Sequence, residues 1–286
     1  MSFKKIISFR AYAFIIVLLC ALSAQSQDIM VASQAQYKQF MKSKTYLVKY
    51  DNPFSGFNTA MEDAMKKYWN ITPWEVISSA EFEKKRTDKS ASFLFLSEAM
   101  AEKREELRFD ILNVVMGSSS GNLNNMPDLG SVPLSYAFDD DEFAEDDYIY
   151  KLGAILRFVQ FYIESNVKAA DTDVKSIVKE HGKSIRTKEI WFIKEDLDNE
   201  VNTVQRIAAF YDGKVKIVTE QEIVEAIASK NPNVLILHKV GPGKGNSGKC
   251  LKFIISVATG IPYYYNMTEI TSKKPDAFLS ADFKKL

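Results

Sequence analysis

Two stretches of the chain decide the fold: Val76–Leu96, VISSAEFEKKRTDKSASFLFL, and Ile217–Leu237, IVTEQEIVEAIASKNPNVLIL. They align without a gap, so that Val76 corresponds to Ile217 and Leu96 to Leu237. Each stretch predicts a strand, a short helix and a strongly apolar strand. The residues of the first stretch that are identical in the second are Glu81, Lys89, Leu94 and Leu96. Similarity at a fixed offset is typical of a duplicated structural unit.

The similarity continues on both sides of these stretches. Upstream, Tyr46–Val48 corresponds to Ile190–Phe192, and downstream Leu107–Phe109 corresponds to Leu251–Phe253. Between the first and second strands, apolar residues at helical spacing match as well: Met61, Met65 and Tyr68 correspond to Val204, Ala208 and Tyr211. We therefore expect an α/β fold with mixed sheets, built from two tandem copies of a β-α-β-α-β-β-β-α unit. The early strands should pair in parallel and the last strands should add an antiparallel hairpin.

The expected organisation is a signal peptide at 1–26, unit one at 27–168, a linking helix at 169–182 and unit two at 183–286. Within the linker, Asp171–His181 predicts a short helix that Gly182 ends. The sequence leaves open whether the two units share one sheet or pack as separate domains.

Two features distinguish the first copy from the second. Its Ser-, Asn- and Gly-rich loop Gly117–Gly130 has no counterpart, and a loop of that length is typically functional or disordered. Its final helix is expected near Glu142–Val167, with Asp139–Asp141 capping the first turn.

The amino terminus has the pattern of a secretory signal peptide. Its basic side chains are Lys4, Lys5 and Arg10. An apolar run follows from Ala11 to Ala24, which is shorter than the roughly 20 residues of a membrane-spanning helix. Small residues allow cleavage after Ser23 or after Ser26. We expect an exported protein that is periplasmic or secreted, or peripheral to the outer membrane, with no transmembrane segment after cleavage.

Charge and cysteine content exclude some functions. The chain has 37 basic and 37 acidic residues, and loss of the basic residues of the signal leaves a slightly acidic chain. Nucleic acid is not an expected partner, because its binding usually requires a basic patch. Cys250 is the one cysteine after the signal, so no intramolecular disulfide is expected, and its predicted role is packing.

The segment Gly243–Cys250, GKGNSGKC, approaches the phosphate-binding loop pattern, with Cys250 in place of the Ser or Thr that binds magnesium. That loop must open a helix, whereas Leu251–Thr259 predicts a strand. A mobile hairpin loop is the favoured interpretation, and no cofactor is expected.

The segment Gly117–Gly121, GSSSG, matches the nucleophile elbow of serine hydrolases. Ser119 would be the nucleophile, with His181 or His238 as the base. An elbow is followed at once by a helix, but Asn122–Pro127 predicts a loop. No catalytic residue is therefore expected, and an exported serine hydrolase using Ser119 and His181 is the alternative.

Other polar clusters also favour structural roles. The acidic run Asp139–Asp147 lacks the spacing of a calcium loop, and neither histidine has a second ligand at zinc spacing, so no metal is expected. Strand alternation would place Tyr263 and Tyr265 on one face and Tyr264 on the other, flanking a core.

The order of elements, with the strand Leu251–Gly260, the Thr259-Gly260 hairpin, Pro262–Met267 and a closing helix at Pro275–Lys285, resembles the α/β unit of TolB amino-terminal domains. Envelope proteins of the curli-secretion type are similar too. The resemblance implies an envelope compartment and binding rather than catalysis. We expect a non-enzymatic binding or adaptor protein of the bacterial cell envelope, with an envelope protein as its candidate partner. The alternatives are the serine hydrolase and a small-ligand-binding protein with a cleft between the two units.

Overall fold

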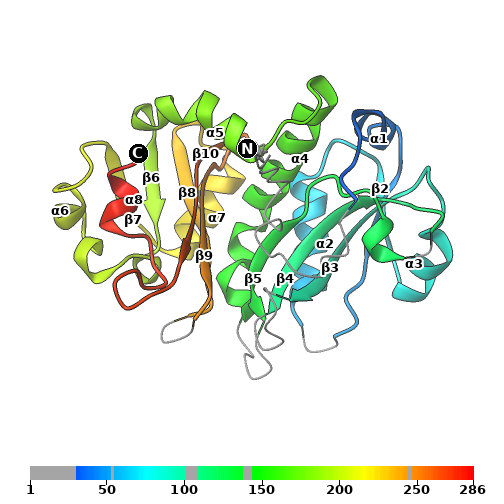
Figure 1. Cartoon of the computed structure of the whole chain (residues 1–286), viewed down its shortest axis with the longest axis horizontal. Coiled ribbons are helices and arrows are strands. Elements are labelled where there is room, and N and C mark those ends of the chain that lie inside the picture. Colours follow the sequence, from blue (N-terminus) through cyan, green and yellow to red (C-terminus); the bar gives the residue numbers. More distant parts are fainter. Residues whose placement is uncertain (1–29, 53–54, 101–107, 121, 138–143, 244–246) are drawn as a thin grey trace, which may run out of the picture.

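The computed structural model describes residues 30–52, 55–100, 108–120, 122–137, 144–243 and 247–286, which form two five-stranded mixed sheets (Figure 1). The strand orders are β2-β1-β3-β4-β5 and β10-β9-β8-β6-β7, so the second sheet repeats the topology of the first. The α/β fold in two similar units is thereby confirmed, and the units have separate sheets. The predicted signal peptide and its candidate cleavage positions lie outside the described residues.

Sheet one combines parallel and antiparallel pairs. Strand β1 pairs in parallel with β2 and β3, and β3, β4 and β5 are successively antiparallel. The elements of the first unit in chain order are α1 (Gln34–Phe40), β1 (Thr45–Val48), α2 (Phe57–Tyr68), β2 (Trp74–Ile77), α3 (Ser79–Lys85), β3 (Ser92–Met100), β4 (Arg108–Met116), β5 (Val132–Ala137) and α4 (Leu152–Lys168).

Sheet two has the same pairing, with β6 parallel to β7 and β8, and an antiparallel hairpin of β9 and β10. Its elements in chain order are α5 (Val174–His181), β6 (Glu189–Phe192), α6 (Val204–Ile207), β7 (Lys214–Ile217), α7 (Glu220–Ala228), β8 (Val234–Val240), β9 (Lys249–Ser256), β10 (Pro262–Glu269) and α8 (Ser280–Phe283). Helix α5 precedes β6 as α1 precedes β1, so the helix expected as a linker has a counterpart at the start of unit one.

Helix α4 lies between the two sheets (Figure 1). It is apolar on nearly all sides, as expected for a helix surrounded by protein. One central core joins it to both units and includes Leu94 and Leu112 of sheet one together with Ile236 and Phe253 of sheet two. Two smaller cores cover the outer faces, under α3 on sheet one and under α6 and α8 on sheet two. The units are therefore packed on each other through α4.

Equivalent helices of the two units start in the same way. Helix α3 is capped by Ser78 with Glu81, and α7 by Thr219 with Glu222, each a reciprocal capping box. These pairs occupy equivalent positions in the alignment that places Val76 on Ile217. The caps explain why both helices begin at these positions.

The strands on either side of these helices do not keep that alignment. Tyr46 pairs with Phe93, and its counterpart Ile190 pairs with Leu235, so Phe93 corresponds to Leu235 rather than to Val234. A shift by one residue exchanges the two faces of a strand. Short changes in loop length inside the apparently ungapped match account for the error.

The downstream match is also wrong. Val114 lies opposite Leu94 of β3, and Ile255 lies opposite Ile236, the counterpart of Leu94 in β8. Val114 of β4 therefore corresponds to Ile255 of β9. The match of Leu107–Phe109 with Leu251–Phe253 would instead have placed Val114 on Ala258, beyond the end of β9.

Several predicted boundaries need correction. Helix α4 begins at Leu152, after two 3₁₀ turns at Ala144–Asp147 and Ile149–Lys151, rather than near Glu142. Lys151 occupies its N-cap position, and Asp139–Asp141, which were expected to cap the first turn, lie outside the described residues. Helix α5 ends at His181 with Gly182 as its C-cap, as predicted, although Gly182 has a right-handed φ of −57° and leads into a 3₁₀ turn. The closing helix is confined to α8.

The described part of the Gly117–Gly130 loop is held in place by contacts with the rest of unit one, so it is not a disordered insertion. Met126 and Leu129 are buried, and Asp128 forms bridges with Val31 and Val115. The Asp128 carboxylate accepts hydrogen bonds from the backbone of Gly130 and from Ser131. This loop holds the segment before α1 against sheet one.

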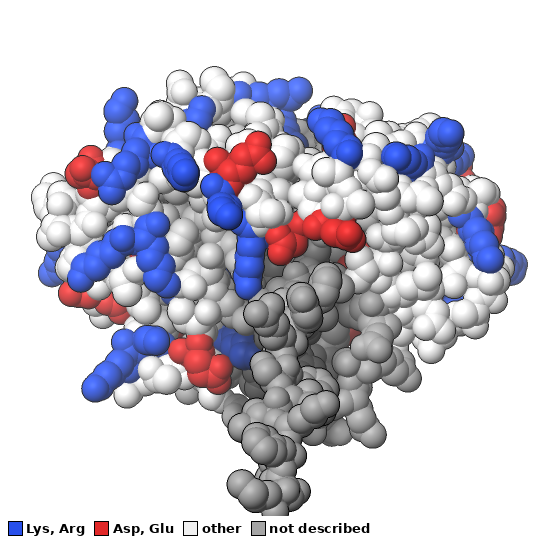
Figure 2. All heavy atoms as spheres, turned by 45° about the horizontal axis from the view of Figure 1, so that its top comes forward, with Lys and Arg blue, Asp and Glu red and all other residues white. Residues whose placement is uncertain are grey.

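The surface is mixed in character. Figure 2 shows Lys and Arg side chains spread over both units on one face, with Asp and Glu side chains between them. Large exposed apolar side chains of the described residues are scattered: Met30, Leu123, Val204 and Val224. No helix in the described ranges combines the length and the apolar character needed to cross a membrane.

Candidate functional site

Strands β6 and β8 are neighbours in sheet two, and the chain leaves their carboxyl ends toward opposite edges of the sheet. After β6 the chain goes to β7 on one side, and after β8 it goes to β9 on the other. In open α/β sheets the crevice at such a point is the usual place for a ligand. The site therefore begins with the residues that follow β6 and those that end β8.

A cavity of about 250 Å³ opens at this place. Unit two contributes Glu195 and Asp196 after β6, Lys239 and Gly241 at the end of β8, and Glu220 at the start of α7. Unit one closes the other side with Ser135 of β5 and the turn before α4, namely Asp147, Tyr150 and Lys151. The cavity thus lies between the two units.

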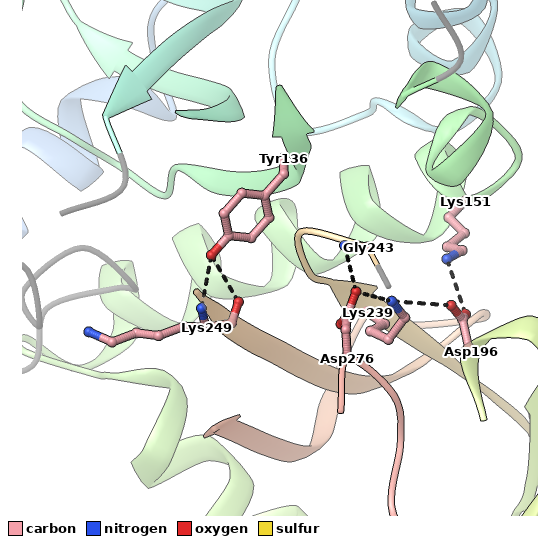
Figure 3. Close-up of polar contacts among 7 residues, drawn as sticks. All are labelled: Tyr136, Lys151, Asp196, Lys239, Gly243, Lys249 and Asp276. Atoms are coloured by element: carbon pink, nitrogen blue, oxygen red, sulfur yellow. Dashed lines mark hydrogen bonds and ion pairs between the residues drawn. The ribbon is translucent and has the colours of Figure 1, made fainter. Parts of the chain in front are cut away.

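Four charges of alternating sign follow one another here, of which Lys151, Asp196 and Lys239 line the cavity (Figure 3). Lys151 Nζ lies 3.8 Å from Asp196 Oδ2, and Lys239 Nζ lies 3.9 Å from Asp196 Oδ1. Lys239 also donates to Asp276 Oδ2 at 3.2 Å, which accepts from the backbone N–H of Gly243 at 2.9 Å. Lys239 and Asp276 form a hydrogen-bonded pair, whereas Asp196 stands between two ammonium groups without a hydrogen bond to either.

Lys151 is unusual in this series. Its residue is 2% exposed, and Asp196 at 3.8 Å is its one ion-pair partner among the described residues. The buried Oδ2 of Asp196 accepts no hydrogen bond. The Lys151 side chain has lost nearly all contact with water, and its ammonium lies 4.7 Å from the centroid of the Tyr150 ring, whereas the Asp196 side chain keeps 17% exposure. A buried charge without a hydrogen-bonded partner is costly unless something else binds there.

Burial acts on the protonation of both lysines. It lowers the pKa of Lys151, and the carboxylates near it oppose this shift without overcoming it. Burial also works against the charged form of Lys239, but Asp196 and Asp276 outweigh it and raise the pKa to about 12. Desolvation raises the pKa of Glu220 on the wall. Lys239 is thus a fixed positive charge, and Lys151 is the group whose charge depends on its surroundings.

Direct contacts hold the two units together beside the cavity. The Tyr136 hydroxyl of β5 donates to the carbonyl of Lys249 at 2.9 Å and accepts from the Lys249 N–H at 3.1 Å (Figure 3). His238 Nε2 lies 2.9 Å from the carbonyl of Pro133. Strand β5 is thereby fixed against β8 and β9.

The structure does not bring together Ser119 and the two histidines that were considered as its base in the serine-hydrolase alternative. Ser119 is exposed just beyond β4, where Gly117 and Ser118 donate to the carbonyls of Ala91 and Arg86, and a 3₁₀ turn rather than an α-helix follows. The ring of His181 contacts those of Phe161 and Tyr263 in another part of the fold.

The other candidate base, His238, is fully buried. Burial and the Lys151 ammonium lower its pKa to about 3, so this ring is neutral. It faces Pro133 and no nucleophile among the described residues.

The other sequence motifs that were considered as functional sites occupy structural positions. The Gly243–Cys250 segment, of which residues 244–246 are not described, leads into strand β9, which begins at Lys249, and not into a helix. Cys250 is buried, and burial raises the pKa of its thiol. Glu145 of the acidic run accepts from the N–H of Gly56 at 2.8 Å, at the start of α2. Within the described residues, no cluster of three or more His, Cys, Asp or Glu side chains fits a metal ion.

The tyrosine run departs from simple alternation. A β-bulge between Pro262 and Tyr264 puts Tyr263 and Tyr264 in the same outer core, while Tyr265 packs on the central core. The Tyr264 hydroxyl donates to Asp282 at 2.7 Å. These tyrosines flank the core and do not form an exposed surface.

Comparison with protein-family models, with curated proteins and with solved structures finds no match for this chain.

Proposed function

We propose that the protein is an exported binding protein for a small zwitterionic molecule, which it holds in the cavity between its two units. The observation that supports this most is the Lys151–Asp196 pair, a buried ammonium group and a partly buried carboxylate 3.8 Å apart that line the cavity at the carboxyl ends of β6 and β8. Export is proposed from the signal pattern at 1–26.

The charges on the wall suggest the ligand's chemistry. Lys151 has an ammonium group available for a carboxylate or another anionic group. Three further carboxylates, Asp147, Glu195 and Glu220, line the same space and favour a positively charged group. A small molecule with both groups, such as an amino acid, complements both parts of the cavity. Binding would complete the hydrogen bonding of Lys151 and Asp196.

Calorimetric titration of the purified chain with single amino acids tests this function. The panel includes amines and carboxylates that have one charged group only. We expect at least one zwitterion to bind, and the singly charged analogues to bind more weakly. Lys151→Met should weaken binding tenfold or more, because a methionine fills similar volume without an ammonium group.

Lys194→Met is the matched control, since Lys194 is exposed in the 3₁₀ turn that contains Asp196 and does not line the cavity. It should bind as the parent does. If no zwitterion binds, or if Lys151→Met binds as well as the parent, the proposed function is wrong. The adaptor function stays a prediction, which crosslinking in intact cells would test.

A further inference from the structure

Arg157 carries a positive charge into the middle of the protein. It lies in the second turn of α4 and is 8% exposed. Its Nη1 donates to the carbonyl of Ile227 at 2.9 Å and to that of Val257. The guanidinium also lies over the ring of Tyr68, with 4.8 Å between the guanidinium carbon and the ring centroid. The side chain is therefore held in one position.

None of these contacts supplies a negative charge. Within the described residues no carboxylate forms an ion pair with Arg157, and its buried Nη2 has no hydrogen-bond acceptor. A guanidinium stays protonated in proteins, and buried charges are normally paired. The group that would balance the charge of Arg157 is an anion.

A second cavity, of about 160 Å³, lies beside this side chain. Its walls come from both units: Lys67 and Asn70 at the end of α2, and Lys230 and Thr259 from the turns after α7 and β9. Glu164 of α4 is the one acidic residue on the wall, against three basic ones. The cavity therefore combines a surplus of positive charge with amide and hydroxyl donors.

We propose that this second cavity binds a small oxyanion, such as phosphate, sulfate or a carboxylate group. Arg157 is the fixed charge, and Lys67 and Lys230 are flexible charges that close over the anion from the two units. The site is distinct from the first cavity. No residue lines both cavities. An anion bound here would link the two units.

The test measures binding of inorganic phosphate, sulfate and acetate to the full chain by calorimetry, with chloride at equal ionic strength as the reference. We expect one site per chain. The variant Lys67→Ala/Lys230→Ala should lower the affinity tenfold or more. Both lysines are exposed, so this variant should keep its fold. Lys84→Ala/Lys175→Ala, which removes two exposed lysines that do not line the cavity, should bind as the parent does.

Arg157→Met should abolish binding. This variant also loses the hydrogen bonds of Arg157 to two carbonyl groups, and if it does not fold, the Lys67→Ala/Lys230→Ala variant provides the test. The proposal is overturned if none of the three oxyanions binds more tightly than chloride, or if the Lys67→Ala/Lys230→Ala variant keeps the parent affinity. Lys151→Met should leave oxyanion binding unchanged, so failure of the first site and failure of this one are distinguishable.

Discussion

Replacing Lys252 by methionine should be among the most destabilising changes in sheet two. Lys252 of β9 is 0% exposed, and its Nζ donates to Asp282 Oδ2 of α8 at 2.6 Å. Asp282 also accepts from the hydroxyl of Tyr264, the amide of Asn266 and the backbone N–H of Leu279. Removing the lysine leaves a buried carboxylate with hydrogen bonds but without a counter-ion.

The expected cost follows from this geometry. Breaking a buried ion pair by removing one partner typically costs about 3–5 kcal/mol. Lys252→Met should therefore lower the free energy of unfolding by about that much at pH 7. The double variant Lys252→Met/Asp282→Asn removes both charges and should recover most of the loss, because neutral replacements of a buried pair are often tolerated.

The effect should also depend on pH. In the parent, burial alone would raise the pKa of Asp282, but the Lys252 ammonium and the hydrogen bonds outweigh it and lower that pKa. This contribution to stability is present above the carboxyl's unfolded pKa and is lost as the pH falls through the folded pKa. In Lys252→Met, burial should raise the pKa of Asp282. The carboxyl then protonates at higher pH, and the loss of stability shrinks on acidification.

Urea unfolding followed by tryptophan fluorescence at pH 7 and pH 4.5 measures these differences. A loss below about 1 kcal/mol at pH 7 for Lys252→Met would refute the reasoning, because it lies well below the cost of an uncompensated buried charge. A double variant as unstable as the single one would refute it as well.

Two further stability predictions follow from buried groups. His238 stays neutral in the fold with its pKa near 3, so below about pH 6.5 the unfolded chain takes up a proton that the native state does not. His238→Gln should reduce the slope of the free energy of unfolding against pH by up to about 1.4 kcal/mol per pH unit, measured by urea unfolding between pH 6 and pH 4. An unchanged slope would contradict this. Gly260 has a φ of +75°, and an added Cβ would lie 2.2 Å from the carbonyl carbon of Arg157. Gly260→Ala should lower the free energy of unfolding by more than about 1 kcal/mol in the same assay. An unchanged free energy of unfolding would show that the β9–β10 turn does not pack closely against α4.

The order of the elements could be predicted because short local sequence patterns determine it. The apolar runs of β3 and β8 and the capping pairs Ser78/Glu81 and Thr219/Glu222 are short patterns that need no knowledge of distant residues. Strand register could not be predicted in the same way. In an apolar run such as Phe93–Leu96 both faces are buried, so a shift of one residue leaves the pattern almost unchanged.

The candidate site could not be found from local patterns. Lys151, Asp196 and Lys239 come from both units and meet only when α4 packs between the sheets. One signal was present, since Lys151 is a charged residue inside the apolar stretch Tyr148–Val159. The positions of Asp196 and Lys239 just after or at the carboxyl ends of predicted parallel strands were a second signal.

Hydrogen–deuterium exchange of the full chain, with and without the tightest-binding amino acid, tests the central claim most directly. We expect slower exchange in segments from both units, at 147–151, at 193–196 and at 239–241, because the ligand lies between them. Protection confined to one unit, or located away from these three segments, would contradict a binding site in the cavity between the units.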